Sequence, residues 1–201
     1  MAKTDIGVFL VVLAGCWQIL GYVLYISQTF KGTSIPNPVS WTLWFFIIIL
    51  NAASYLDMTG DWVKTLIPII SSIMMVIIYV QLIFKVGLRL GRLDAIEWSV
   101  FGLGMAACIV WVLFRSATFG NLLFQLPFAI SFIPTIRGVW RNPETEASRA
   151  WIMFAAAYFI SILVVLLRWQ GHLQDLVFPI NAFILHGLVA SLSFRNHRLS
   201  M

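Results

Sequence analysis

The sequence predicts an all-α membrane protein in which seven transmembrane helices form two parallel three-helix repeats joined by a linker helix. Of the 201 residues, 61% are hydrophobic and only 10% are charged, whereas about a quarter of the residues in a soluble domain are charged. Seven apolar runs approach the length of about 20 residues that a helix needs to cross a bilayer. Residues of the first and third runs recur in the fifth and seventh at a nearly constant offset, which indicates an internal repeat.

The apolar runs predict helices rather than strands. They cover residues 6–30, 39–58, 63–84, 95–114, 118–140, 149–168 and 173–194. Strands of a membrane barrel would instead alternate polar and apolar residues over about ten positions. The connections are short and carry glycine or charge, so we expect one helical bundle without a soluble domain. The first run lacks a basic leader and an A-x-A site, so we expect it to be retained.

The repeat is clearest where the first and fifth runs end. Gln28 lies near the end of the first run, and Thr135 follows it by 107 positions, beside Pro134. Gln18 and Gln125 each precede these residues by ten positions. We therefore expect the two glutamines to face each other across the axis that relates the repeats. There they either frame a central site or tie the halves together.

The offset divides the chain into three parts. We assign residues 1–85 to the first three-helix repeat, 86–116 to the linker helix and 117–201 to the second repeat. Because each repeat has an odd number of spans, a single crossing between them lets both repeats point the same way. Two parallel repeats related by an axis along the membrane normal are one plan found in transporters.

The distribution of lysine and arginine predicts the orientation. Nine of these residues fall in the connections after the first, third and fifth runs or at the C-terminus, and four fall on the other side. The side with the excess is cytoplasmic by the positive-inside rule. We expect a multi-pass integral membrane protein with its N-terminus outside and its C-terminus in the cytoplasm. The basic residues form no continuous stripe, so no nucleic-acid partner is expected.

Short motifs resemble those of the PQ-loop and SWEET transporter superfamily, whose members have a three-one-three arrangement of helices. The Pro-Gln dipeptide of that superfamily is half kept in each repeat, as Ser27-Gln28 and as Pro134-Thr135. Asp175 followed by Pro179-Ile180-Asn181 resembles the head of the seventh helix of the superfamily. Tyr79-Val80-Gln81-Leu82 resembles the end of its third helix. The resemblance covers most of the chain.

The resemblance implies a carrier that works by alternating access, and it implies that Asn181 binds substrate. The candidates for a gate or hinge are Gln28, Pro134, Thr135, Trp41 and Trp151. The two tryptophans are matched by the repeat near the predicted cytoplasmic end, where they also suit membrane anchors. The chain departs from the sugar-carrying SWEET proteins because its first, second and sixth runs contain no proline.

Polar groups within the apolar runs are the candidates for a site, because such groups are costly in a bilayer and face the bundle interior, a partner helix or a cavity. The candidates for substrate binding are Asn181, Trp44, Asn51, Gln18, Gln125, His186 and Ser72. An amide both donates and accepts hydrogen bonds, and an indole offers a stacking face. A histidine titrates near neutral pH, so His186 is a candidate proton relay. The structural alternative for the amides is interhelical hydrogen bonding, and for His186 it is a bond to a backbone carbonyl.

The positions of the acidic residues and the absence of known motifs limit the functions that the sequence predicts. All eight acids lie at or near the ends of the runs, whereas a proton-coupled carrier ordinarily has a carboxylate within the membrane. We therefore expect uncoupled transport. No HExxH, GxSxG, Walker or Rossmann pattern is present, so we expect neither enzyme activity nor a metal or cofactor. Cys16 and Cys108 lie in apolar runs and are interpreted as core residues.

The sequence therefore predicts a small-solute membrane carrier for a neutral or zwitterionic substrate such as a sugar. The alternative is a non-transporting seven-helix receptor or membrane assembly factor on the same fold, since a fold does not determine function. The expected partners are a small-molecule substrate and the lipid bilayer, and the sequence leaves a homo-oligomer open.

Overall fold

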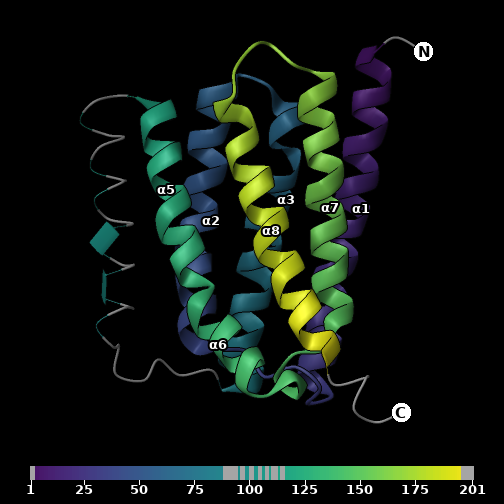
Figure 1. Cartoon of the computed structure of the whole chain (residues 1–201), viewed down its shortest axis with the longest axis vertical. Coiled ribbons are helices and arrows are strands. Elements are labelled where there is room, and N and C mark those ends of the chain that lie inside the picture. The colour runs from purple at the N-terminus through teal and green to yellow at the C-terminus, as the bar shows by residue number, and fades with distance from the viewer. Residues whose placement is uncertain are drawn as a thin grey trace.

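The computed structural model of the chain describes residues 3–87 and 116–195, and between these ranges only positions 95, 98, 99, 102, 103, 106, 109 and 113. The expected linker, residues 86–116, and its span, 95–114, lie almost wholly outside the described residues. Every regular element in the described ranges is helical. The elements are α1 (Lys3–Phe30), α2 (Pro38–Thr59), α3 (Trp62–Gln81), η1 (Leu82–Val86), α5 (Ala117–Ser131), α6 (Ile133–Arg141), η2 (Pro143–Thr145), α7 (Ser148–Leu167) and α8 (Gln174–Ser193) (Figure 1).

Six helical stretches of the described chain are long and apolar enough to cross a membrane. They are Asp5–Phe30, Pro38–Thr59, Trp62–Phe84, Ala117–Arg141, Ser148–Leu167 and Gln174–Ser193. The ends of six predicted runs lie within one residue of these bounds, because the loss of apolar residues and the helix-capping residues fall at the same places. The predicted all-helical class is confirmed. Six helices of this length and apolar composition are consistent with a multi-pass membrane protein.

Helix ends follow local capping rules. The side chain of Asn37 accepts hydrogen bonds from the backbone N–H groups of Val39 and Ser40 at 3.1 and 3.0 Å, and Pro38 opens α2. A proline is tolerated there because the first N–H groups of a helix have no partner within it. Asp61 caps α3 in the same way. These caps set where the second and third spans start.

The span Ala117–Arg141 is broken in two at Phe132. α5 ends at Ser131, and α6 begins at Ile133 with Pro134 in its first turn. Proline has no N–H to donate and its ring crowds the preceding turn, so a continuous helix is interrupted just before it. The ring of Phe132 sits at the break and is only 1% exposed. The break therefore delivers one aromatic side chain to the interior.

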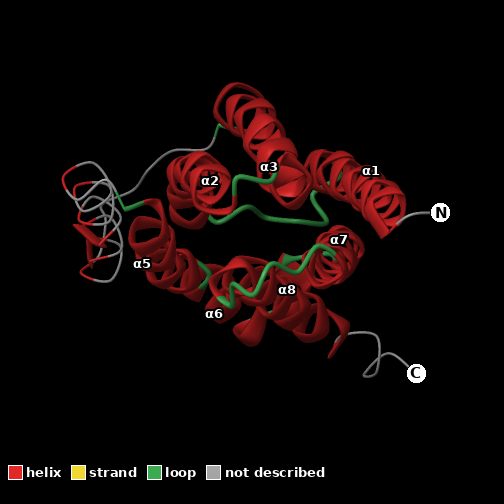
Figure 2. Cartoon of the chain, turned by 90° about the horizontal axis from the view of Figure 1, so that it is seen from above, coloured by secondary structure: helices red, strands yellow, loops and turns green. Residues whose placement is uncertain are grey.

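The helices form two layers of three (Figure 2). In one layer α3 packs between α1 and α2, and in the other α8 packs between α7 and the α5–α6 span. Across the layers α1 packs on α7 and α2 packs on α5. The colours of Figure 1 show that each layer runs down, up and down along the chain. A site that is lined by both layers therefore lies in the interior between them.

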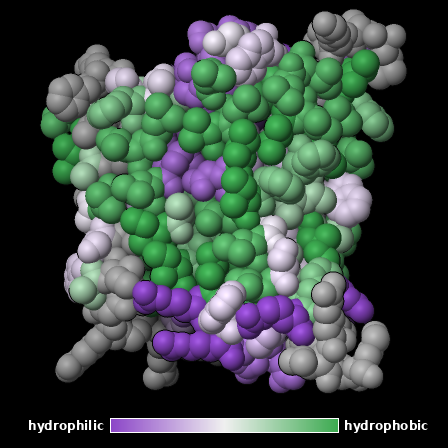
Figure 3. Space-filling model, in the orientation of Figure 1, coloured by the Kyte–Doolittle hydropathy of each residue, from purple (hydrophilic) through white to green (hydrophobic). Residues whose placement is uncertain are grey.

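The face of the molecule in Figure 3 has an apolar band and hydrophilic ends. Large apolar side chains such as Phe9, Val12 and Ile184 are more than half exposed on the band. In water such a surface would be costly, whereas hydrocarbon chains cover it at no cost. The band matches the six spans that composition and length indicate.

Candidate functional site

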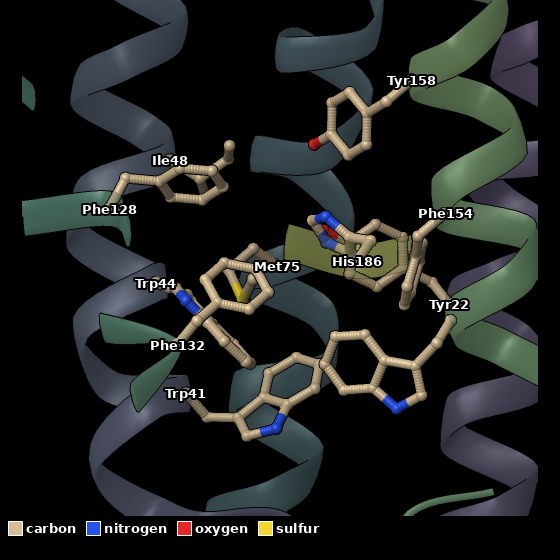
Figure 4. Close-up of a pocket in the computed structure, with 11 residues that line it drawn as sticks. Tyr22, Trp41, Trp44, Ile48, Met75, Phe128, Phe132, Phe154, Tyr158 and His186 are labelled. Atoms are coloured by element: carbon tan, nitrogen blue, oxygen red, sulfur yellow. The ribbon is translucent and has the colours of Figure 1, made fainter. Parts of the chain in front are cut away.

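An aromatic cavity lies between the two layers, and its side chains point toward one another in Figure 4. Its volume is about 30 Å³, which is room for about two water molecules. Side chains from both layers and from the break at Phe132 contribute to it. The lining residues are Tyr22, Trp41, Trp44, Ile48, Met75, Phe128, Phe132, Trp151, Phe154, Tyr158 and His186.

The rings around the aromatic cavity contact one another at steep angles. The ring centroid of Trp44 lies 5.3 Å from that of Trp41 and 6.0 Å from that of Trp151, with interplanar angles of 77° and 67°. Phe132 lies 4.6 Å from Trp44 and 5.1 Å from His186. Aromatic pairs of this kind contribute about 0.5–1.5 kcal/mol beyond the area they bury. The lining is therefore held in place by contacts among the rings themselves.

His186 and Trp44 each bring a ring nitrogen to this lining. Nδ1 of His186 lies 2.7 Å from the carbonyl oxygen of Ala182, and because a carbonyl only accepts, Nδ1 carries the proton and Nε2 keeps its lone pair. The indole N–H of Trp44 is buried and has no hydrogen-bond partner among the described residues. The cavity thus combines many aromatic faces with one free acceptor and one unpaired donor.

A buried carboxyl group ties the layers together at the end of the bundle where α7 begins. Tyr25, Trp41, Glu146 and Trp151 form what we call the Glu146 network. Tyr25 donates its hydroxyl to Oε1 of Glu146 at 2.9 Å, and Trp151 donates its indole N–H to Oε2 at 3.1 Å. Trp41 donates its indole N–H to the Tyr25 hydroxyl at 3.1 Å. Because Trp41 and Trp151 also line the aromatic cavity, the network closes that end of it.

Glu146 carries an unbalanced charge when it is ionised. It is 3% exposed and forms no ion pair in the described part of the chain. Burial raises the pKa of its carboxyl to about 8, although hydrogen bonds from Trp151, Tyr25 and Ser34 favour the charged form. The carboxyl group is therefore largely protonated at neutral pH.

Two ion pairs join the layers at the opposite end, and we call Asp61, Lys64, Arg168 and Asp175 the ion-pair cluster. Nζ of Lys64 lies 2.7 Å from Oδ2 of Asp175, and these side chains are 0% and 2% exposed. Nε of Arg168 lies 2.7 Å from Oδ2 of Asp61, with exposures of 23% and 7%. Burial acts to raise the pKa of Asp61, but hydrogen bonds from Arg168 and from the Val63 N–H hold it below its usual value.

Four amide side chains gather between α2, α5 and α8, and we call Asn51, Asn121, Gln125 and Asn181 the amide cluster. Oδ1 of Asn51 accepts hydrogen bonds from Asn121 at 3.1 Å and from Gln125 at 3.0 Å. Asn181 donates to the backbone carbonyl of Gln125 at 3.1 Å. None of the four lines the aromatic cavity. A small hydrophilic patch at mid-height over α5 and α8, the helices that carry Gln125 and Asn181, interrupts the apolar face in Figure 3.

The residues predicted to bind substrate therefore fall into separate groups. Trp44 and His186 line the aromatic cavity, whereas Asn51, Gln125 and Asn181 belong to the amide cluster. The remaining two make other contacts.

Gln18 donates to the Ser71 hydroxyl at 2.8 Å. Ser72 donates to the Pro68 carbonyl one helical turn earlier at 2.9 Å, and to the Ile48 carbonyl at 3.1 Å. Gln18 and Gln125 share no hydrogen-bond partner among the described residues. The reason is that Gln18 packs on α3 of its own layer and Gln125 packs on α2 across the layers.

The predicted gate or hinge residues lie at the end of the bundle that holds the Glu146 network. Trp41 and Trp151 belong to that network, and Pro134 lies in the first turn of α6. The carbonyl of Gln28 accepts the backbone N–H of Thr33 at 2.9 Å and shapes the connection after α1. Thr135 is 3% exposed, and its hydroxyl has no partner among the described residues.

Sequence reasoning did not identify the roles of Tyr25, Lys64, Asn121 and Glu146. Lys64 sits just inside an apolar run, and a charge there signals a buried partner. Asn121 lies one helical turn before Gln125, which is the spacing of side chains on one face. Glu146 could not be recognised from the sequence, because it lies in a polar connection and its contact with Tyr25 depends on the packing of α1 against α7.

Comparisons of the chain with protein-family models, with curated proteins and with solved structures found no match. Among the described residues no group of three or more His, Cys, Asp and Glu side chains is arranged to hold a metal ion. The structure therefore defines the class: a helical protein with six helices long and apolar enough to cross a membrane and an aromatic cavity between two layers.

Proposed function

We propose that the protein is a small-solute membrane carrier that works by alternating access, without ion coupling, on a neutral or zwitterionic substrate such as a sugar. One observation carries this proposal: the aromatic cavity lies between two layers that are joined by polar contacts at both ends. In alternating access, two bundles rock about a site between them. Opening one end requires the contacts there to break while those at the other end hold. The Glu146 network and the ion-pair cluster are suited to these two roles.

The helix packing supports two parallel repeats within this proposal. The first helix of each layer packs on the second helix of the other, as α1 does on α7 and α5 does on α2. A twofold exchange of the layers preserves these contacts. α3 and α5 begin at the same end of the bundle (Figure 1), so the chain between them has to cross once, which supports a fourth span at 95–114. With the lysine and arginine distribution, a fourth span supports the proposal that the N-terminus lies outside and the C-terminus in the cytoplasm.

The proposal is tested by solute uptake into proteoliposomes that contain the purified protein. Labelled sugars, neutral amino acids and zwitterions form the panel, and Trp44→Leu is expected to abolish the uptake of whichever solute is carried. Phe46→Leu is the matched control, because Phe46 lies on the same helix but is 49% exposed. Unchanged uptake by Trp44→Leu removes the aromatic cavity from the pathway. Uphill accumulation driven by a pH gradient contradicts the absence of coupling.

The alternative is a seven-helix receptor or assembly factor. The observation that favours it is the concentration of four charges in the ion-pair cluster at one end of the bundle. These charges are engaged with one another, whereas a receptor pocket for a charged ligand needs charges that are free to bind it. A protein that binds a charged peptide at this end and moves no solute of the panel would support the alternative.

A further inference from the structure

We propose that the aromatic cavity recognises the methylated ammonium group of a small solute, through the faces of its aromatic rings and the negative charge of Glu146. The inference deepens the proposed carrier function by naming the group that is recognised, which selects a solute with an ammonium group over a sugar, and its role in transport rests on that function. The binding itself is a property of the cavity and is tested separately.

The first argument comes from the chemistry of the lining. A cation over the face of an aromatic ring is attracted by the ring quadrupole, and tryptophan is the strongest such partner. Three tryptophans, Trp41, Trp44 and Trp151, contribute rings that stand at 67° or 77° to a neighbouring one. Such steeply inclined rings present their faces from different sides. A fully methylated, quaternary ammonium has no N–H to satisfy, so a wall with few hydrogen-bonding groups suits it.

The second argument comes from what a sugar would meet in the same cavity. A sugar brings many hydroxyl groups, and each one buried without a partner costs about 1–3 kcal/mol. Besides its two tyrosine hydroxyls, the lining offers the Trp44 N–H and the lone pair of His186 Nε2. Among neutral and zwitterionic solutes, the cavity therefore favours one whose buried end is an ammonium rather than a polyol.

The third argument is the charge around the cavity. No lysine or arginine is among its lining residues. His186 keeps a lone pair on Nε2, because its Nδ1–H is bound to the Ala182 carbonyl. The carboxyl of Glu146 accepts the indole N–H of Trp151, so this acid is a single ring away from the cavity. An ionised Glu146 has no basic partner in the described chain, and a bound cation would supply the missing positive charge.

This charge arrangement couples the binding of the cation to the ionisation of Glu146. The groups that face Glu146 are the phenol of Tyr25 from α1, the indole of Trp151 from α7 and the hydroxyl of Ser34 from the α1–α2 connection. A cation in the cavity favours the ionised form of Glu146, and by linkage the ionised form favours the cation. Binding therefore releases a proton from the carboxyl group and strengthens as the pH rises. The present volume of about 30 Å³ is smaller than a trimethylammonium group, so the rings have to part to admit it.

The decisive experiment compares two ligands of the same shape on the purified wild-type protein. Binding of choline and of its uncharged isostere 3,3-dimethylbutan-1-ol is measured by tryptophan fluorescence and by calorimetry, with tetramethylammonium and glycine betaine as further probes. Choline is expected to bind at least about tenfold more tightly than the isostere, as a desolvated cation–π site predicts. Equal affinities, or no binding of any of the ammonium probes, would overturn the proposal.

Variants then locate the site. Trp44→Leu should weaken choline binding by about tenfold or more, whereas Trp62→Leu, at a tryptophan that is 57% exposed, should leave it unchanged. Glu146→Gln should weaken choline binding and remove its increase between about pH 6 and pH 9, without changing affinity for the isostere. A Glu146→Gln protein with the wild-type pH dependence would refute the role of this carboxyl.

The two proposals can fail independently. Ammonium binding without uptake into proteoliposomes would refute the carrier function and leave the recognition of the ammonium group standing. Uptake of other solutes by a protein that binds no ammonium probe would refute the recognition and leave the carrier function standing.

Discussion

The ammonium of Lys64 and the carboxylate of Asp175 lie 2.7 Å apart although the two residues are separated by 111 positions in the chain. Lys64 also donates to the side chain of Gln170 at 3.4 Å, and Tyr55 donates to the backbone carbonyl of Asp175. Burying two charges is costly, and only good geometry with further hydrogen bonds offsets that cost. This pair therefore fixes the position of one layer relative to the other at this end of the bundle.

Removing one member of that pair should destabilise the protein strongly. Asp175→Asn leaves Lys64 buried without a counter-charge, and we expect a loss of about 3–5 kcal/mol in the free energy of unfolding. Asp61→Asn is the control: Arg168 is 23% exposed and asparagine still caps α3, so the loss should be below about 1 kcal/mol. Denaturant unfolding in detergent measures both. Equal losses for the two variants would contradict the buried character of the Lys64–Asp175 pair.

The stability of the protein should depend on pH through Glu146. Its pKa is raised from an ordinary value of 4.5 to about 8, so between these values the folded protein binds the proton that the unfolded chain has lost. The free energy of unfolding then falls as the pH rises through this window, by up to about 1.4 kcal/mol per pH unit. Glu146→Gln should remove this dependence. Melting temperatures of the two proteins from pH 5 to pH 9 test it, and parallel curves would show that Glu146 does not titrate there.

The close approach of α1 and α7 should depend on Gly21. A Cβ atom at this position would lie 2.6 Å from Cε1 of Phe154 and 3.3 Å from Cβ of Met153, so Gly21→Ala has to push the helices apart. We expect a loss of about 1–3 kcal/mol from this overpacking. Gly187→Ala is the matched control, because a Cβ there meets nothing within 4 Å, and the better helix propensity of alanine should stabilise it by about 0.5–1 kcal/mol. In a thermal-unfolding assay, Gly21→Ala is expected to lower the melting temperature and Gly187→Ala to raise it. A change in the same direction for both variants would contradict the tight contact.

Replacing the central acceptor of the amide cluster should destabilise the protein. Asn51→Leu leaves the Asn121 and Gln125 donors without their common partner, and we expect a loss of about 1–3 kcal/mol. Ser72→Ala is the control, since the helix retains its backbone hydrogen bonds without that hydroxyl, and its loss should be smaller. Unfolding measurements of both variants test the order. A smaller effect at Asn51 than at Ser72 would show that the cluster contributes little.

The positions of six spans could be predicted from the sequence because crossing a bilayer imposes a local requirement. A run such as 63–84 is recognisable from its own residues, and Asn37 or Asp61 announces a helix start by its own capping chemistry. The sequence also showed which residue types were suited to lining a site. Trp44 and His186 do line the cavity, because a polar or aromatic group in an apolar run tends to face the bundle interior.

What the sequence by itself determined was therefore the class of protein, the limits of the six spans that the structure describes and the interior side of several helices. Tertiary structure alone decided that Asn51, Gln125 and Asn181 form a cluster apart from Trp44 and His186, and that Glu146 is a buried acid. The physical reason is that burial and hydrogen bonding depend on neighbours supplied by distant parts of the chain. Tyr25, 121 positions from Glu146, is close to it only because α1 packs against α7.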